Sequence, residues 1–155
     1  MTEGTIFSIN VSPGGVPKLP VADAMVTAMG LDSDSHANLK HHGGPDRAVC
    51  LFAIERILEL RAEGHPIGTG TTGENLTVAG IDWDLVVPGT MLEAGDTLLE
   101  VVSFAAPCRT IRESFIEEKF SRMSEKVNPG WSRAYARVIR EGVVRTGDRV
   151  VLKEG

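Results

Sequence analysis

Short apolar or alternating segments, separated by turns that contain glycine, recur along the whole chain and constrain its fold more than any other feature. Residues 6–11 alternate apolar and polar side chains before Ser12-Pro13-Gly14-Gly15 interrupts them, as expected of a half-buried strand entering a turn. Similar runs lie at residues 47–52, 75–78, 91–93, 98–104, 143–144 and 150–152. About seven short strands with 17 glycines and few helices predict a mainly β protein with peripheral α segments, folded as a closed or nearly closed β-barrel.

Two Gly-Asp dipeptides mark the tightest expected turns. Gly95-Asp96 and Gly147-Asp148 each lie between short apolar runs, and Gly-Asp is typical of a two-residue hairpin loop. We therefore expect residues 143–144 and 150–152 to form the last pair of strands.

Helical spacing is restricted to two segments. From Ala53 to Glu63 the apolar residues recur at helical intervals, and Gly64-His65-Pro66 ends this predicted helix. Residues 66–73 are rich in glycine, proline and threonine and are expected to form a loop. Residues 111–123 carry a second helical pattern, interrupted by polar side chains.

Length, charge and cysteine content limit the class of protein. The 155 residues suit a single domain spanning 1–155. The net charge of -5 argues against nucleic-acid and anionic-membrane partners, although a local basic pocket is compatible with it. Two distant cysteines, with no signal peptide and no apolar stretch of transmembrane length, predict a cytoplasmic protein.

Cys108 is the strongest candidate for a reactive residue. Pro107 has no N–H and therefore ends the preceding strand, which places Cys108 at a rim where side chains often face a ligand. The neighbouring Arg109 favours a thiolate, the form that attacks electrophiles and ligates soft metals. A buried structural thiol is the alternative, but we favour a function. Cys50 lies inside the apolar run 48–52 and is expected to be packed in the core.

One cluster has side chains that suit a hard or borderline metal, and it consists of His36, His41, His42 and Asp46. Its spacing matches no recognised zinc pattern, and adjacent histidines on an extended segment point to opposite sides. We therefore favour an anion-binding loop, in which Gly43 and Gly44 let backbone amides approach the ligand and Arg47 supplies positive charge. A metal-dependent hydrolase is a third-ranked hypothesis.

Two further segments leave a ligand-binding and a structural interpretation open. The turn at residues 12–17 can deliver Lys18 to a phosphate, or Lys18 can be an ordinary solvated lysine. Glu74 can act as an acid or base and Asn75 can hold an amide or hydroxyl of a ligand, yet both also suit turn and capping roles.

Six segments, taken in order, resemble the MOSC domain family, named for the C-terminal domain of molybdenum cofactor sulfurases. They are residues 12–18 (SPGGVPK), 30–34 (GLDSD), 42–49 (HGGPDRAV), 73–76 (GENL), Pro107-Cys108, and 135–138 (YARV) followed by Gly142 and Gly147-Asp148. The match is collinear over nearly the whole chain. Residues 130–134, which lead into Tyr135, depart from the family pattern, so no family role carries over to Trp131 or Arg133.

The resemblance implies a β-barrel with peripheral helices and the molybdenum cofactor, a molybdopterin, as ligand. The family cysteine that matches Cys108 coordinates molybdenum or handles sulfur. Cofactor-binding roles are expected at Lys18, His42, Arg47, Asn75 and Arg109. We expect a stand-alone version, without the pyridoxal-phosphate desulfurase domain of the sulfurases or the extra N-terminal β domain of the mitochondrial amidoxime-reducing proteins. Pyridoxal phosphate binding therefore enters only as a term for the family as a whole.

The resemblance also implies an activity. We expect Cys108 to ligate molybdenum in an oxidoreductase that reduces small N-hydroxylated compounds. The sequence carries no motif for flavin, haem or an iron–sulfur cluster, so an electron-donor protein is the expected partner. The alternative is a sulfur carrier or cofactor-delivery protein, which accepts sulfur from a donor as a Cys108 persulfide. No oligomeric state is predicted.

Overall fold

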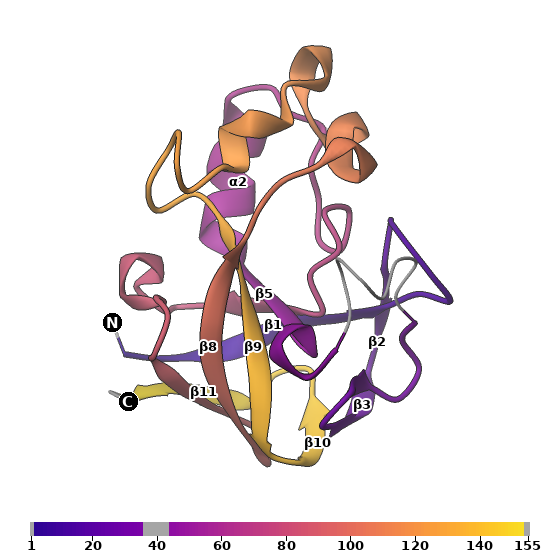
Figure 1. The fold of residues 1–155 in the computed structure, drawn as a ribbon, viewed down its shortest axis with the longest axis vertical. Coiled ribbons are helices and arrows are strands. Elements are labelled where there is room, and N and C mark those ends of the chain that lie inside the picture. The colour runs from indigo at the N-terminus through magenta and orange to yellow at the C-terminus, as the bar shows by residue number, and fades with distance from the viewer. Residues whose placement is uncertain (1, 36–43, 154–155) are drawn as a thin grey trace.

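The structure of the protein is a computed structural model that describes residues 2–35 and 44–153. Within these residues a seven-stranded β-barrel forms the centre of the molecule (Figure 1). Its strands, in spatial order, are β11 (Arg149–Lys153), β7 (Met91–Ala94), β8 (Thr97–Ala105), β9 (Arg133–Arg140), β5 (Val49–Ala53), β6 (Leu76–Ala79) and β1 (Glu3–Val11). Pairing of β1 with β11 closes the barrel. The predicted mainly β architecture is confirmed.

Alternation along the strands separates the core from the surface. In β7 and in the first half of β8 every second side chain is buried, which is the period-two pattern expected of a sheet with one buried face. Large apolar side chains fill the interior, among them Ile6, Ile9, Leu51, Phe52, Leu76 and Leu99. The hydrophobic effect of their burial is the main stabilising term for the barrel.

One pair of barrel strands is parallel. β5 and β6 run in the same direction, whereas the other described neighbours in the barrel are antiparallel. A parallel pair needs a crossover connection, which here consists of α2 (Ile54–Ala62) and residues 63–75. α2 lies outside the strands at one end of the barrel (Figure 1) and buries Ile54, Ile57 and Leu60. The helix and the loop predicted for this region are both confirmed.

A small second sheet accompanies the barrel. It contains β10 (Gly142–Arg145), β3 (Asp23–Thr27) and β4 (Gly30–Leu31), while β2 (Leu19–Val21) pairs with the end of β1. β2, β3 and β4, which have two to five residues each, were not predicted from the sequence.

The predicted hairpin at Gly147-Asp148 is wrong. β10 pairs with β3 in the small sheet, and β11 pairs with β7 and β1 in the barrel. The turn itself is bound to β1, because the N–H of Gly147 donates to the carbonyl of Ile6 and the N–H of Ile6 donates to the carbonyl of Asp148. The other predicted hairpin, at Gly95-Asp96, joins β7 to β8 and is confirmed.

No α-helix forms between residues 109 and 123. Three 3₁₀ helices lie there instead: η3 (Arg109–Ser114), η4 (Ile116–Glu118) and η5 (Phe120–Met123). The second of them contains Glu117 and Glu118 at positive φ angles of 53° and 59°, which an α-helix excludes. The apolar positions of the sequence pattern still anchor this segment, since Ile111, Phe115 and Met123 are buried.

Two further 3₁₀ turns complete the chain, η1 (Pro45–Arg47) and η2 (Trp83–Leu85). Because η1 occupies residues 45–47, the strand predicted from residue 47 begins only at Val49. In the described part of the chain, no helix has both the length and the apolar character required to cross a membrane.

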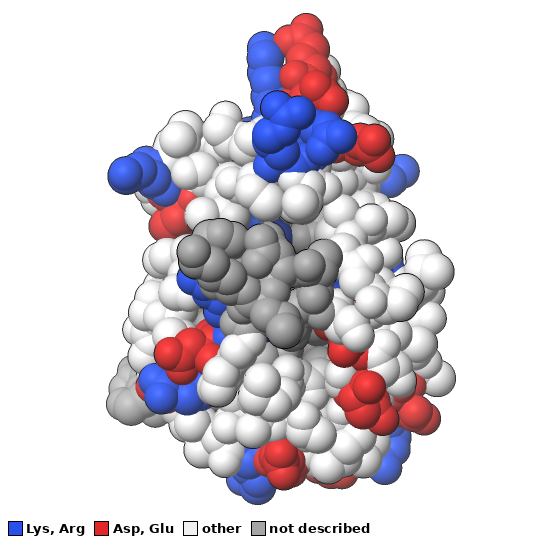
Figure 2. Space-filling view, turned by 45° about the vertical axis from the view of Figure 1, so that its right-hand side comes forward, with Lys and Arg blue, Asp and Glu red and all other residues white. Residues whose placement is uncertain are grey.

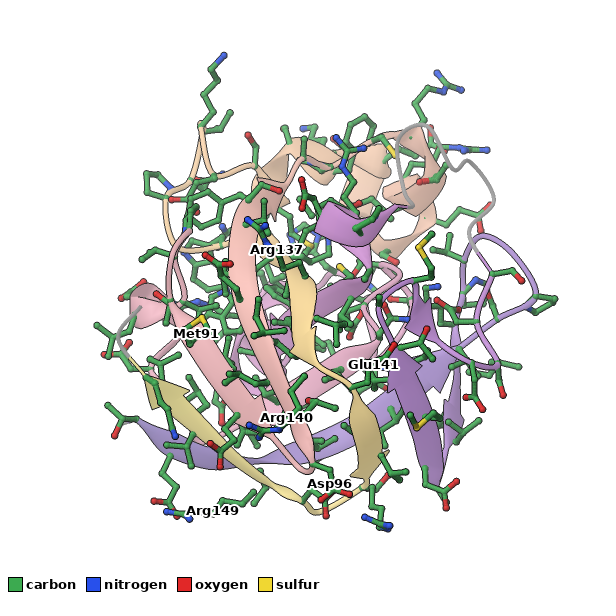
Figure 3. The ribbon with its side chains drawn as sticks, turned by 60° about the horizontal axis from the view of Figure 1, so that its bottom comes forward. Met91, Asp96, Arg137, Arg140, Glu141 and Arg149 are labelled. Atoms are coloured by element: carbon green, nitrogen blue, oxygen red, sulfur yellow. The ribbon has the colours of Figure 1, made fainter. Side chains whose placement is uncertain are left out.

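Charged side chains contact one another on the surface at the end of the barrel where β8 begins and β9 ends, beside the Asp96 turn. Figure 3 shows Asp96 and Arg140 close together there, and the Nε of Arg140 donates to the carbonyl of Asp96 at 3.2 Å. At the same end of this view Arg149 projects outward, where it forms an exposed ion pair with Glu3. The candidate site lies at the other end of β8 and β9.

Candidate functional site

A pocket opens where β8 ends and β9 begins. Several parts of the chain meet there: residues 15–18 after β1, Ser35, Arg47 of η1, residues 72–75 before β6, residues 110–111 after β8, and side chains from β5 and β9. The pocket contains about 560 Å³ of space, its open mouth included. The barrel thus brings residues more than 100 positions apart to one cavity.

The charged residues of the described pocket lining are Lys18, Arg47 and Arg133, and all three are cationic. Figure 2 shows one face of the molecule, with a compact group of Lys and Arg side chains in its upper middle and acidic side chains spread around it. Charges of both signs therefore cover this face, whereas the charge within the pocket lining has one sign. An anionic ligand suits such a pocket.

Lys18 forms a buried ion pair. Its Nζ lies 2.7 Å from each carboxylate oxygen of Asp34, and the two side chains are 8% and 2% exposed. The carboxylate of Asp34 also accepts from the N–H of Ser12 and from the Nδ2 of Asn75, each at 2.9 Å. Sequence analysis assigned no role to Asp34, because no local pattern relates positions 18 and 34.

Asn75 holds three strands of the framework together. Its Oδ1 accepts from the N–H of Cys50 on β5 at 3.0 Å, and its Nδ2 donates to the carbonyl of Asn10 on β1 at 3.3 Å as well as to Asp34. These bonds use both hydrogens of the amide. Of the two interpretations left open for Asn75, the contacts support the structural one, and its role in cofactor binding stays a prediction.

Arg47 and Tyr135 form a contact at the pocket wall. The guanidinium carbon of Arg47 lies 5.7 Å from the centre of the Tyr135 ring, within the range of a cation–π interaction. Burial raises the pKa of Tyr135 to about 12. The phenol therefore stays protonated at neutral pH and is a neutral donor in the pocket lining.

Arg133 is a buried arginine that sequence analysis left without a role. Its Nη1 donates to the carbonyl of Thr72 at 2.6 Å, and its Nη2 donates to the carbonyls of Ala105 and Ala106 at 3.4 and 3.3 Å. Its Nε is buried and has no hydrogen-bond partner among the described residues. Arg133 thereby ties the end of β8, just before Cys108, to the loop that precedes β6. Because its partners are backbone carbonyls, no residue type in the sequence could have indicated them.

Cys108 lies at the rim, as predicted. β8 ends at Ala105, and Cys108 is partly exposed immediately before η3. Its Sγ lies 2.8 Å from the Oγ1 of Thr110, which lines the pocket. The thiol is therefore one hydroxyl away from the lining. Arg109 is exposed and is not part of the described lining, so its role in cofactor binding stays a prediction.

Cys50 is buried, as predicted, and is 5% exposed. It packs with Ala105 and Tyr135, and it also contributes to the pocket lining. Burial raises the pKa of its thiol to about 11, although the guanidinium of Arg133 opposes this shift. Cys50 is consequently a neutral thiol at the base of the site.

The predicted histidine cluster falls largely outside the described residues, since His36, His41 and His42 lie in the range 36–43. Asp46 is exposed, and its carboxylate lies 3.9 Å from the Nε of Arg137. Among residues 2–35 and 44–153, no group of three histidine, cysteine or acidic side chains is arranged to hold a metal ion. The cofactor role of His42 stays a prediction.

Comparison with known families and curated proteins identifies similar chains. The model of the MOSC domain family matches residues 38–151. The uncharacterized protein YflK of Bacillus subtilis (strain 168) is 30% identical over 141 residues, which cover 89% of this chain and 62% of YflK. Protein YiiM of Escherichia coli (strain K12) is 30% identical over 125 residues, covering 77% of this chain and 56% of YiiM. The chain thus spans about six tenths of the length of these relatives.

Solved structures share the fold. The crystal structure of YiiM from Geobacillus stearothermophilus superposes with a TM-score of 0.75 at 28% identity, covering 97% of this chain and 75% of that one. The YuaD protein of Bacillus subtilis superposes with a TM-score of 0.76 over 99% of this chain and 97% of that one, and at 18% identity it supports the fold alone.

Proposed function

Because this chain belongs to the MOSC domain family, we propose that it binds the molybdenum cofactor in the pocket described above and reduces small N-hydroxylated compounds with electrons from a partner protein. One observation carries the proposal: a pocket whose charged lining residues are all cationic adjoins a partly exposed thiol at its rim. A molybdopterin is anionic at its phosphate and presents a soft metal at its other end, so it needs positive charge and a thiolate in one site.

The residues present fit this cofactor. The ion pair with Asp34 neutralises Lys18, so the excess positive charge of the described lining comes from Arg47 and Arg133. Arg47 would hold the anionic end, and Arg133 would add the field of a buried guanidinium. At the metal end, Cys108 would supply the soft ligand.

The cofactor, when bound, supplies the electron transfer. Conversion of an N-hydroxyl group to N–H consumes two electrons and two protons and releases water, so the protein must orient the substrate and provide protons. Tyr135 is a protonated donor that can orient a substrate in the pocket. The electrons come from a separate donor protein.

The proposal is tested on protein purified gently with its cofactor. Reduction of an N-hydroxylated base or an amidoxime is measured with reduced viologen as electron donor. Cys108→Ser replaces a soft thiolate with a hard, poorly ionised hydroxyl and should abolish the reduction while leaving the fold intact. Cys50→Ser is the matched control and should retain the reduction. Full activity of Cys108→Ser would remove Cys108 as the metal ligand.

Metal and pterin analysis of the same preparation is an independent test. Molybdenum and pterin close to one per chain would support the proposal. Zinc alone would favour the hydrolase hypothesis instead.

Sulfur transfer is a second candidate function, favoured by the partial exposure of Cys108 next to the hydroxyl of Thr110. An accessible thiolate can attack the outer sulfur of a donor persulfide, form its own persulfide and release the donor thiolate, whereas the buried Cys50 is shielded from a donor. Persulfide trapped on Cys108, cyanide-releasable sulfur without molybdenum, and no N-hydroxyl reduction by any variant would together establish the carrier.

A further inference from the structure

A fully buried carboxyl group lies directly behind the pocket. Glu74 is 0% exposed and lies two residues before β6. It forms no ion pair within 4.0 Å with any described residue, yet it is surrounded by hydrogen-bonding groups. A buried carboxyl that is hydrogen-bonded but not ion-paired needs an explanation, because the interior of a protein penalises its charged form.

The two oxygens of Glu74 have different surroundings. Oε2 accepts from the N–H of Gly70 at 3.1 Å and from the hydroxyl of Thr77 at 2.9 Å, so it faces two donors. Oε1 is bonded to the hydroxyl of Thr72 at 3.2 Å. The N–H of Gly70 can only donate, and the Oγ1 of Thr77 already accepts from the Nδ2 of Asn10 at 3.1 Å, whereas the hydroxyl of Thr72 can accept as well as donate. When the carboxyl is neutral, its proton therefore belongs on Oε1, where the Oγ1 of Thr72 accepts it.

Thr72 connects this carboxyl to the pocket. It is fully buried from bulk solvent but forms part of the pocket lining. Its carbonyl accepts from the Nη1 of Arg133, which fixes the backbone at this position. Glu74 Oε1 is thus hydrogen-bonded to the side chain of a residue that belongs to the pocket lining.

The environment favours the neutral form of Glu74. Burial raises the pKa of its carboxyl, while the N–H of Gly70, its own N–H, the hydroxyl of Thr77 and the charge of Arg133 on β9 oppose that shift. Two uncharged groups also lie close: Asn10 of β1 bonds the carbonyl of Glu74, and Cys50 of β5 is a neutral thiol. The ion pair of Lys18 with Asp34, which is bonded to the adjacent Asn75, contributes charges of both signs.

We propose that Glu74 is a buried proton source for the reaction in the pocket and that the hydroxyl of Thr72 relays its proton to the ligand. This inference rests on the proposed function. As the N–O bond of R–NH–OH breaks, the leaving oxygen takes the hydroxyl proton of Thr72 while Oε1 of Glu74 gives its proton to Thr72 Oγ1. The nitrogen takes a second proton from water, and two molecules of reduced viologen, or the donor protein, supply two electrons. The products are R–NH₂ and water, and solvent reprotonates Glu74 through Thr72.

Glu74→Gln is a close structural match for the neutral carboxyl. Its carboxamide oxygen can accept from Gly70 and Thr77, and its NH₂ can donate to Thr72, so the hydrogen-bond pattern survives without a transferable proton. We expect an unchanged KM and a kcat lower by about 10²-fold, the lower limit for loss of a positioned general acid. Glu93→Gln makes the same chemical change at an exposed position on β7 and should leave kcat unaltered.

Two variants test the shape and the hydroxyl group of Thr72 separately. Thr72→Val keeps the branched shape but removes the relay, and should lower kcat as much as Glu74→Gln does. Thr72→Ser restores a hydroxyl and should recover most of the loss. Equal defects in Thr72→Val and Thr72→Ser would overturn the relay in favour of a packing role.

The protonation state is measured without cofactor. The infrared spectrum of the apo-protein at neutral pH should contain the C=O band of a protonated carboxyl that is missing in Glu74→Gln. Absence of such a band would overturn the relay and leave the proposed function untouched, as would wild-type kcat in Glu74→Gln. Failure of the loaded wild-type protein to reduce any N-hydroxyl compound would remove the proposed function, and the relay with it, whatever the infrared result.

Discussion

The Nζ of Lys18 lies 2.7 Å from both carboxylate oxygens of Asp34, and the pair is almost completely removed from solvent. The Nζ of Lys153 lies at the same distance from an oxygen of Glu93, but those side chains are 51% and 38% exposed. Two ion pairs of equal length therefore lie in opposite environments of one molecule, one buried and one exposed. Removal of one partner from a buried pair leaves an uncompensated charge, whereas an exposed partner is resolvated.

Asp34→Asn should accordingly lower the free energy of unfolding by about 3–5 kcal/mol. Glu93→Gln should change it far less, because solvent screens the exposed pair. Urea unfolding at neutral pH measures both. The double variant Lys18→Met/Asp34→Asn should lose less than the sum of its single variants, because it leaves no unpaired charge. Similar costs for Asp34→Asn and Glu93→Gln would contradict the assignment of a buried pair.

Stability should depend on pH through Glu74. The unperturbed pKa of this carboxyl is 4.5, and burial raises the pKa in the folded state. The unfolded chain therefore releases the proton first as pH rises, so stability present below pH 4.5 is lost as pH rises through the folded-state pKa. Glu74→Gln cannot ionise and should gain stability relative to wild type between pH 4 and pH 8, as measured by urea unfolding. A constant difference across this range would contradict a protonated Glu74.

The two cysteines should differ in reactivity. Burial raises the pKa of Cys50 to about 11, so at pH 8 about one molecule in a thousand carries its thiolate, and that thiolate is shielded. Cys108 is partly exposed. Iodoacetamide should add one label to the native protein, on Cys108, and two labels after unfolding in urea. Mass spectrometry of the peptides identifies the site, and rapid native labelling of Cys50 would refute the prediction.

Gly70 and Gly147 both have positive φ angles, at 75° and 93°, but their surroundings differ. A Cβ at Gly147 would meet no atom within 4 Å, whereas a Cβ at Gly70 would overlap the carbonyl of Lys18. Gly147→Ala should therefore cost only the backbone strain, about 1–2 kcal/mol. Gly70→Ala should cost clearly more, because it also separates the residue 70 loop from Lys18. Thermal unfolding of the two variants compares them, and equal melting temperatures would be inconsistent with this contact.

The barrel could be predicted because short apolar or alternating runs separated by glycine-containing turns are visible in single segments of the sequence. The pairing partner of a strand cannot be predicted from a single segment in this way. Gly147-Asp148 has the composition of a hairpin loop, but hydrogen bonds to Ile6, more than 140 positions away, separate the two strands that flank it. The helix predicted within residues 109–123 was wrong for a related reason, because apolar spacing alone does not exclude the positive φ angles of Glu117 and Glu118.

Some residues of the candidate site could likewise be predicted from the sequence, and others could not. Pro107-Cys108 was predictable because proline ends a strand by a local mechanism, and the rim position follows. Asp34 and Arg133 were not, because their function in the structure depends on a buried lysine and on backbone carbonyls brought together by the fold. Two interpretations of Asn75 were compatible with the sequence, and the hydrogen bonds of its side chain to β5 and β1 support the structural one.

The parallel pairing of β5 with β6 has a consequence for how this scaffold can change. The antiparallel strands β7 and β8 are joined by a tight hairpin, where an inserted residue shifts the register of both strands. A parallel pair requires the chain to leave the sheet and return, so the connection can vary in length while the strands stay in register. Here that connection is residues 54–75, and its last part forms one wall of the pocket. New ligand preferences are therefore accessible to this barrel through insertions and deletions in a single segment, without any alteration to the strands that keep it closed.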